Sequence, residues 1–213
     1  MAAGRSDEVR TIQTADGLAL RAELWTQDDP VATAAICHPH PLYGGDMYNN
    51  VVSALFDHLG RAEVACLRFN FRGSGGSEGR HDSGGGERLD VTAAIDELSD
   101  RWPDRPLLMA GYSFGADVAL AVDDDRISGW LAVAPPLRVV AIDEMVAGTD
   151  PRPKRIVTGS ADDFRPPDQV RAATGHWTNC EITVADGANH FFAVGLDTVL
   201  AAATALLRQL ADH

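Results

Sequence analysis

The chain has 213 residues, of which 45% are hydrophobic and 23% are charged. This length and composition are typical of a globular protein and exclude a disordered one, so we expect residues 1–213 to form one domain. The formal net charge of -13 argues against nucleic acid or an anionic membrane as a partner, because both attract Lys and Arg. A neutral or cationic small molecule fits such a surface better, although solubility alone also explains the acidity.

The three cysteines, Cys37, Cys66 and Cys180, lie far apart, within or beside apolar segments. Their odd number and placement favour buried free thiols over disulfides or metal ligands. The first eight residues are mostly polar, unlike a secretory signal, and no later apolar segment approaches the roughly 20 residues of a membrane span. We therefore expect a soluble, cytoplasmic protein.

Two alternating β-prone segments open the chain, at residues 9–14 and 18–25, and Asp16-Gly17 between them predicts a two-residue hairpin. The pattern then changes to short apolar runs, typical of strands buried on both faces of a parallel sheet. These strands are expected at 32–38, 63–70, 107–112, 129–133, 155–159 and 181–184. Helices are expected at 50–59, 87–101, 114–122, 167–173 and 194–210. The alternation predicts an α/β fold with a doubly wound, mostly parallel sheet and N-terminal antiparallel strands.

In such sheets ligands bind beyond the carboxyl ends of the strands, so the residues after each strand are the first candidates for function. The segment Gly111-Tyr112-Ser113-Phe114-Gly115 joins an apolar strand to a helix rich in small residues. A Gly-x-Ser-x-Gly sequence in this context is typical of a nucleophile elbow, a strained turn that exposes the serine. An ordinary strand-to-helix turn is the alternative, and the partners of Ser113 have to decide between them.

A serine nucleophile needs a base, and the base needs a carboxylate that orients it, in the chain order Ser, Asp or Glu, His. Of the internal histidines, only His176 and His190 follow Ser113 and a suitable carboxylate. His176 precedes its strand, which places it at the wrong end of the sheet, whereas His190 follows that strand. The carboxylate after the strand at 155–159 is Asp162, with the adjoining Asp163 as the alternative.

Oxyanion donors are expected on both sides of Ser113. The helix that begins at Phe114 offers backbone N–H groups, and the segment 38–45 after the first buried strand is expected to supply a second donor. Pro39 and Pro41 have no N–H, so His40 is the first choice and Leu42 the alternative.

His38 and His40 also form a His-x-His pair, but two histidines are too few for a usual zinc site. We expect no metal and no cofactor.

The glycine-rich segment 70–79 has some similarity to a phosphate-binding loop. It lacks the Lys-Ser/Thr ending of such a loop, and the next helix begins only near Glu87. We therefore expect a structural turn in which Arg72 tethers loops by hydrogen bonds.

Over nearly its whole length the chain resembles the α/β-hydrolase superfamily, and within it the small lidless hydrolases related to dienelactone hydrolases and acyl-peptidase-type esterases. The resemblance is carried by residues 38–45 with Asn49-Asn50, 69–75 with Ser77 and Gly79, 111–115, 159–162 and 188–192. It implies a Ser113-Asp162-His190 triad, N–H donors from Phe114 and the loop at His40, and ester or related acyl bonds as substrates. Dienelactone hydrolases proper look to have cysteine where this chain has Ser113, so the resemblance does not extend to their substrate.

The stretch 134–154 is too short for a separate lid domain, so we expect an open site for small acyl substrates. Candidates for its apolar wall are Tyr43, Phe114, Leu137, Met145, Phe164 and Phe191. The expected function is a serine hydrolase that works through an acyl-serine intermediate. An acyltransferase or a peptidase on the same triad, and a non-catalytic binding module of the same fold, are the alternatives.

Overall fold

The computed structural model describes residues 7–211, and its strands form one eight-stranded sheet in the order β1-β2-β4-β3-β5-β6-β7-β8. The strands are β1 (Asp7–Gln13), β2 (Ala19–Trp25), β3 (Ala32–Cys37), β4 (Val64–Phe69), β5 (Leu107–Tyr112), β6 (Ile127–Val133), β7 (Lys154–Gly159) and β8 (Cys180–Ala185). β1 pairs with β2, and β2 with β4, in antiparallel fashion, and every other pair is parallel. The prediction of a mostly parallel sheet with N-terminal antiparallel strands is confirmed.

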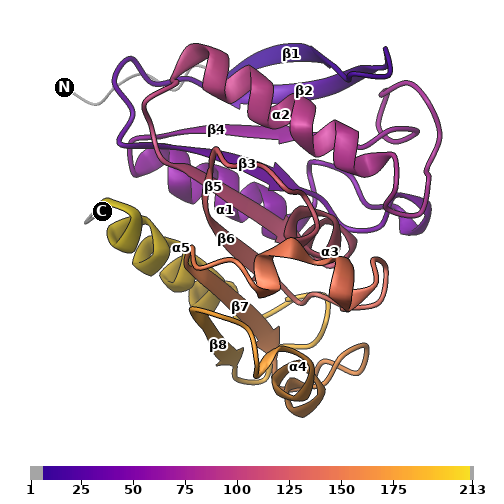
Figure 1. Ribbon diagram of the computed structural model, residues 1–213, viewed down its shortest axis with the longest axis vertical. Coiled ribbons are helices and arrows are strands. Elements are labelled where there is room, and N and C mark those ends of the chain that lie inside the picture. The colour runs from indigo at the N-terminus through magenta and orange to yellow at the C-terminus, as the bar shows by residue number, and fades with distance from the viewer. Residues whose placement is uncertain (1–6, 212–213) are drawn as a thin grey trace.

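Helices cover both faces of this sheet. They are α1 (Asn50–Arg61), α2 (Glu87–Arg101), α3 (Phe114–Leu120), α4 (Pro167–Thr174) and α5 (Leu196–Ala211). α1 and α5 pack on one face, and α2, α3 and α4 on the other (Figure 1). All residues of β3, β4 and β5 are buried, which is why these strands are continuous apolar runs in the sequence.

The predicted two-residue hairpin between β1 and β2 is wrong. Gln13 pairs with Ala19, and the N–H of Thr14 donates to the carbonyl of Leu18, so the loop comprises residues 15–17. Gly17, at φ +87°, takes the left-handed position that a three-residue hairpin loop requires. The Thr14 hydroxyl bonds the Asp16 carboxylate at 2.6 Å and accepts the Leu18 N–H at 2.9 Å, which favours the longer loop.

The connection between β6 and β7 contains two short 3₁₀ turns, Ile142–Glu144 and Val146–Gly148. Met145 and Ala147 of this connection are buried in the core. The part of the chain that the structure describes therefore has no separate lid over the carboxyl ends of the strands.

The cysteines are free thiols, as predicted, although only Cys37 and Cys66 are buried and Cys180 is partly exposed. No helix within residues 7–211 combines the length and the apolar character needed to cross a membrane.

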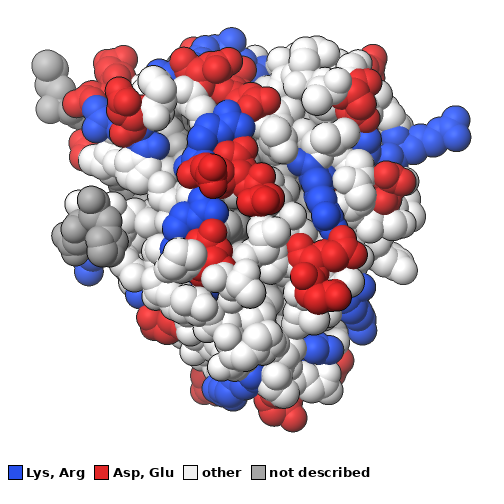
Figure 2. All heavy atoms as spheres, in the orientation of Figure 1, with Lys and Arg blue, Asp and Glu red and all other residues white. Residues whose placement is uncertain are grey.

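Figure 2 shows basic and acidic side chains side by side around α2, where Arg88 pairs with Glu144 and Arg126 with Asp96.

Candidate active site

Ser113 occupies the sharp turn between β5 and α3, with φ +52° and ψ -119°. Positive φ is rare for a residue with a side chain and is the strained geometry expected of a nucleophile elbow. A Cβ on Gly111 would lie 2.4 Å from the carbonyl oxygen of Gly115, and a Cβ on Gly115 would lie 2.5 Å from that of His38. Both glycines are therefore required by the close approach of strand, turn and helix.

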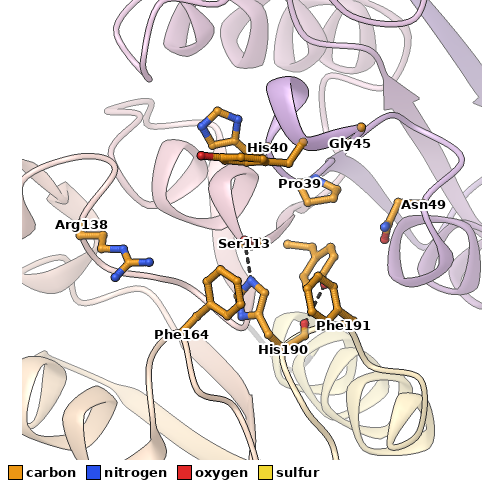
Figure 3. Close-up of a pocket in the computed structure, with 12 residues that line it drawn as sticks. Pro39, His40, Gly45, Asn49, Ser113, Arg138, Phe164, His190 and Phe191 are labelled. Atoms are coloured by element: carbon orange, nitrogen blue, oxygen red, sulfur yellow. Dashed lines mark hydrogen bonds between the residues drawn. The ribbon is translucent and has the colours of Figure 1, made fainter.

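The structure brings the three predicted residues Ser113, His190 and Asp162 into one hydrogen-bonded chain. Ser113 Oγ lies 2.9 Å from Nε2 of His190 (Figure 3). Nδ1 of His190 lies 2.9 Å from Oδ2 of Asp162. The Asp162 side chain is completely buried, whereas Asp163 is exposed. Of the two adjacent carboxylates, Asp162 is thus the one in contact with the imidazole.

Hydrogen bonds hold the loops that carry Asp162 and His190 together. The N–H of Ala161 donates to the carbonyl of Ala188 at 2.9 Å, and the N–H of Gly187 donates to the Ser160 hydroxyl at 2.8 Å. A Cβ on Gly159 would lie 2.2 Å from the Ala188 carbonyl oxygen, so this approach also depends on glycine. The two loops form one support for Asp162 and His190.

Two aromatic side chains position His190. The hydroxyl of Tyr112 donates to the carbonyl oxygen of His190 at 2.7 Å. The ring of Phe164 stacks on the imidazole, with ring centroids 4.3 Å apart and an angle of 19° between the planes. The sequence did not single out Tyr112 as a site residue. Its position directly before Ser113, at the carboxyl end of β5, could have indicated that it lies in the site.

Backbone N–H groups of Phe114 and His40 are the candidate oxyanion donors. Phe114 is the first residue of α3, and the first amides of a helix have no acceptor within it. The N–H of Leu42 donates to Nδ1 of His40 at 3.2 Å, while the N–H of His40 donates to no acceptor among the described residues. Because the N–H of Leu42 is already engaged, His40 is the better candidate for the second oxyanion donor.

The pocket above Ser113 has a volume of about 480 Å³. It is lined by Pro39, His40, Tyr43, Gly44, Gly45, Asn49, Tyr112, Ser113, Arg138, Phe164, His190 and Phe191. Three of the predicted wall residues, Tyr43, Phe164 and Phe191, are among them. The prediction is wrong for Phe114, Leu137 and Met145, whose side chains are buried in the core.

Three of the histidines that were not expected to act as the base, His38, His40 and His81, have structural contacts. His38 is completely buried, donates from Nδ1 to the Pro39 carbonyl at 2.6 Å, and accepts the Phe71 N–H at Nε2 at 3.0 Å. Burial lowers the pKa of His38 to about 4, so its ring is neutral. His81 packs against the ring of His40, with centroids 4.7 Å apart.

Arg72 tethers three segments, as predicted. Its guanidinium bonds the buried Asp90 of α2 and the Asp16 carboxylate of the first hairpin, and its N–H donates to Asp90 as well. Together with His38 it fixes the loops behind the pocket.

Among the described residues, no group of three or more His, Cys, Asp or Glu side chains is arranged to hold a metal ion.

A family model described as serine aminopeptidase, S33, matches residues 31–148. The uncharacterized protein RP471 of Rickettsia prowazekii is 36% identical over 169 residues, which cover 75% of this chain and 71% of that protein. The chain belongs to this family of α/β serine hydrolases.

Solved structures agree with this membership. An α/β serine hydrolase homologue from Coxiella burnetii is 32% identical to this hydrolase, with a TM-score of 0.83, and the match covers 98% of this chain and 99% of that one. XC6422 from Xanthomonas campestris, described as a serine hydrolase without lid, is 25% identical, with a TM-score of 0.84 and coverage of 98% and 97%. The hydrolase is thus similar over its full fold to a lidless protein.

Proposed function

We propose that this hydrolase cleaves carboxylic ester or related acyl bonds of small substrates through an acyl-serine intermediate. The observation that carries the proposal is the unbroken chain of hydrogen bonds from Ser113 through His190 to Asp162, next to an open pocket. A non-catalytic binding module has no need for a strained serine in contact with an oriented base.

The proposed cycle begins when Nε2 of His190 removes the proton of Ser113 as Oγ attacks the carbonyl carbon. The N–H groups of Phe114 and His40 stabilise the oxyanion, and Asp162 stabilises the imidazolium and keeps the other ring proton on Nδ1. His190 then gives its proton to the departing alcohol. Water attacks the acyl group by the same proton transfers, which releases the acid and restores Ser113.

The lining of the pocket favours an ester over the N-terminal peptide bond that an aminopeptidase cleaves. A free α-ammonium group on a substrate requires an acidic or other acceptor-rich subsite. The lining includes no Asp or Glu, and the nearby Asp162 is engaged by His190 and by the N–H groups of Phe164 and Arg165.

Esters of graded acyl length, supplied to the wild type and to Ser113→Ala, test the proposal. We expect Ser113→Ala to lose turnover by several orders of magnitude, and a fluorophosphonate probe to label the wild type at Ser113. Ser99→Ala, in α2 and outside the pocket, is the matched control and should keep both properties. Near-normal turnover by Ser113→Ala, or a wild type that the probe does not label, would contradict the proposal. Product analysis with added alcohols separates hydrolysis from acyl transfer.

A further inference from the structure

A single guanidinium lies in the wall of the pocket that contains Ser113. The chain carries 31 Asp and Glu residues against 18 Lys and Arg, yet the pocket is lined by Arg138 and by no carboxylate side chain. The fixed charge of the pocket wall is therefore opposite in sign to that of the whole chain. The net charge favoured a neutral or cationic ligand, but the local charge that a bound ligand meets favours an anion.

The guanidinium of Arg138 makes no hydrogen bond and no ion pair within the described part of the chain, although its charge interacts with the buried carboxylate of Asp117. Other arginines bind carboxylates, as Arg68 binds Glu23, Arg72 binds Asp90 and Arg152 binds Asp150. Arg138 is exposed, and no ion pair joins it to a described carboxylate. In the view of Figure 3, Arg138 and Asn49 lie on opposite sides of Ser113. Arg138 is thus free to bind a ligand at one end of the pocket.

The backbone of Arg138 is fixed relative to Ser113. The N–H groups of Leu137, Arg138 and Val139 each donate at 2.9 Å to the carboxylate of Asp117. Asp117 is completely buried in α3, one helical turn after Ser113. Because this carboxylate is occupied by three N–H groups, it holds the turn in place without forming an ion pair with the guanidinium. The helix that follows the serine therefore also anchors the arginine.

We propose that the hydrolase acts on esters that carry a carboxylate, and that Arg138 binds this carboxylate while the ester carbonyl lies at Ser113. The inference rests on the proposed ester hydrolysis and assigns its substrate class. The planar guanidinium fork matches a carboxylate in two parallel hydrogen bonds. The exposed rings of Tyr43, Phe164 and Phe191 line the pocket and contact the apolar part of such a substrate. The carboxylate belongs to either the acyl or the alcohol part of the ester.

Two matched pairs of esters test this assignment. For the acyl part, ethyl hydrogen glutarate is compared with the neutral ethyl 5-oxohexanoate. For the alcohol part, 4-acetoxybenzoate is compared with the neutral 4-acetoxybenzamide. In at least one pair we expect Arg138→Gln to lower kcat/KM for the anionic ester by on the order of tenfold to a hundredfold. The kcat/KM of this variant for the neutral ester should stay within about twofold of the wild type. Arg138→Lys should show an intermediate loss, because lysine keeps the charge without the fork.

Arg171 is an exposed arginine of α4 outside the pocket, so Arg171→Gln is the matched control. It should leave kcat/KM unchanged for both the anionic and the neutral ester. Equal losses for the anionic and the neutral ester, or no loss in either pair, would overturn the role of Arg138.

A binding measurement separates this inference from the proposed function. Ser113→Ala is titrated with ethyl hydrogen glutarate and with ethyl 5-oxohexanoate by NMR, with and without Arg138→Gln, and the benzoate pair is titrated in the same way. A preference for the anion that disappears with Arg138→Gln supports the carboxylate site even if the wild type hydrolyses no ester. The absence of such a preference in both pairs overturns the site even if esterase activity is found.

Discussion

His190 and Asp162 contact each other through one hydrogen bond of 2.9 Å, between Nδ1 of the imidazole and Oδ2 of the carboxyl group. The other oxygen of Asp162 accepts the N–H groups of Phe164 at 2.9 Å and Arg165 at 3.2 Å. The carboxylate is therefore held from both sides, and its orientation does not depend on the histidine alone. Asp163, one residue further along the chain, is exposed.

Replacing each of these two carboxylates by an amide of the same shape tests which one serves His190. Asp162→Asn loses the charge that stabilises the imidazolium, so we expect kcat to fall on the order of 10³- to 10⁴-fold. Asp163→Asn should stay within about twofold of the wild type, because surface changes away from the site have small effects. Steady-state kinetics with a short activated ester measure both. A larger loss in the Asp163 variant would reverse the assignment.

The second oxyanion donor can be tested because the backbone at His40 has φ -55°, close to the value that proline imposes. His40→Pro removes both the ring and the N–H group, whereas His40→Ala removes the ring alone. We expect kcat of the proline variant to be on the order of 10²- to 10³-fold below that of the alanine variant, as for the loss of one oxyanion donor. Thermal melting controls for folding. Equal kcat values for the two variants would show that His40 does not supply the donor.

Local sequence was sufficient to predict the elements and the order of the site residues. β3, β4 and β5 are buried on both faces, so their apolar runs identify them without knowledge of their neighbours. The Gly-x-Ser-x-Gly turn was recognisable because strand, glycines and helix are contiguous in the chain. His190 followed from its place after β8, which depends only on the order of the elements.

Contacts between distant segments decided what the sequence left open. The choice between Asp162 and Asp163 depends on which side chain turns toward His190, 28 residues further along. Arg138 was not predicted to line the pocket, because its position depends on Asp117 holding the turn, 21 residues before it. Phe114 and Met145 were assigned to the wall from their apolar character, but the same character places them in the core.

His38 provides a test of pH-dependent stability. Burial disfavours the charged ring and lowers the folded-state pKa from the ordinary 6.5 to about 4. Between these values the unfolded chain binds a proton more readily than the folded protein does. The stability that the neutral His38 contributes is therefore present above pH 6.5 and is lost as the pH falls toward about 4.

His38→Gln removes the titrating group and keeps an acceptor that can reach the Phe71 N–H. Urea unfolding of the wild type and of the variant, at several pH values from 7.5 down to 4.5, measures the two free energies of unfolding. We expect the advantage of the wild type over the variant to shrink as the pH falls, at a rate on the order of 1 kcal/mol per pH unit within this window. Titrating groups shared by both proteins cancel in the difference. Parallel pH profiles would therefore mean that His38 binds its proton equally well in the folded and unfolded states, and that its burial does not keep the ring neutral.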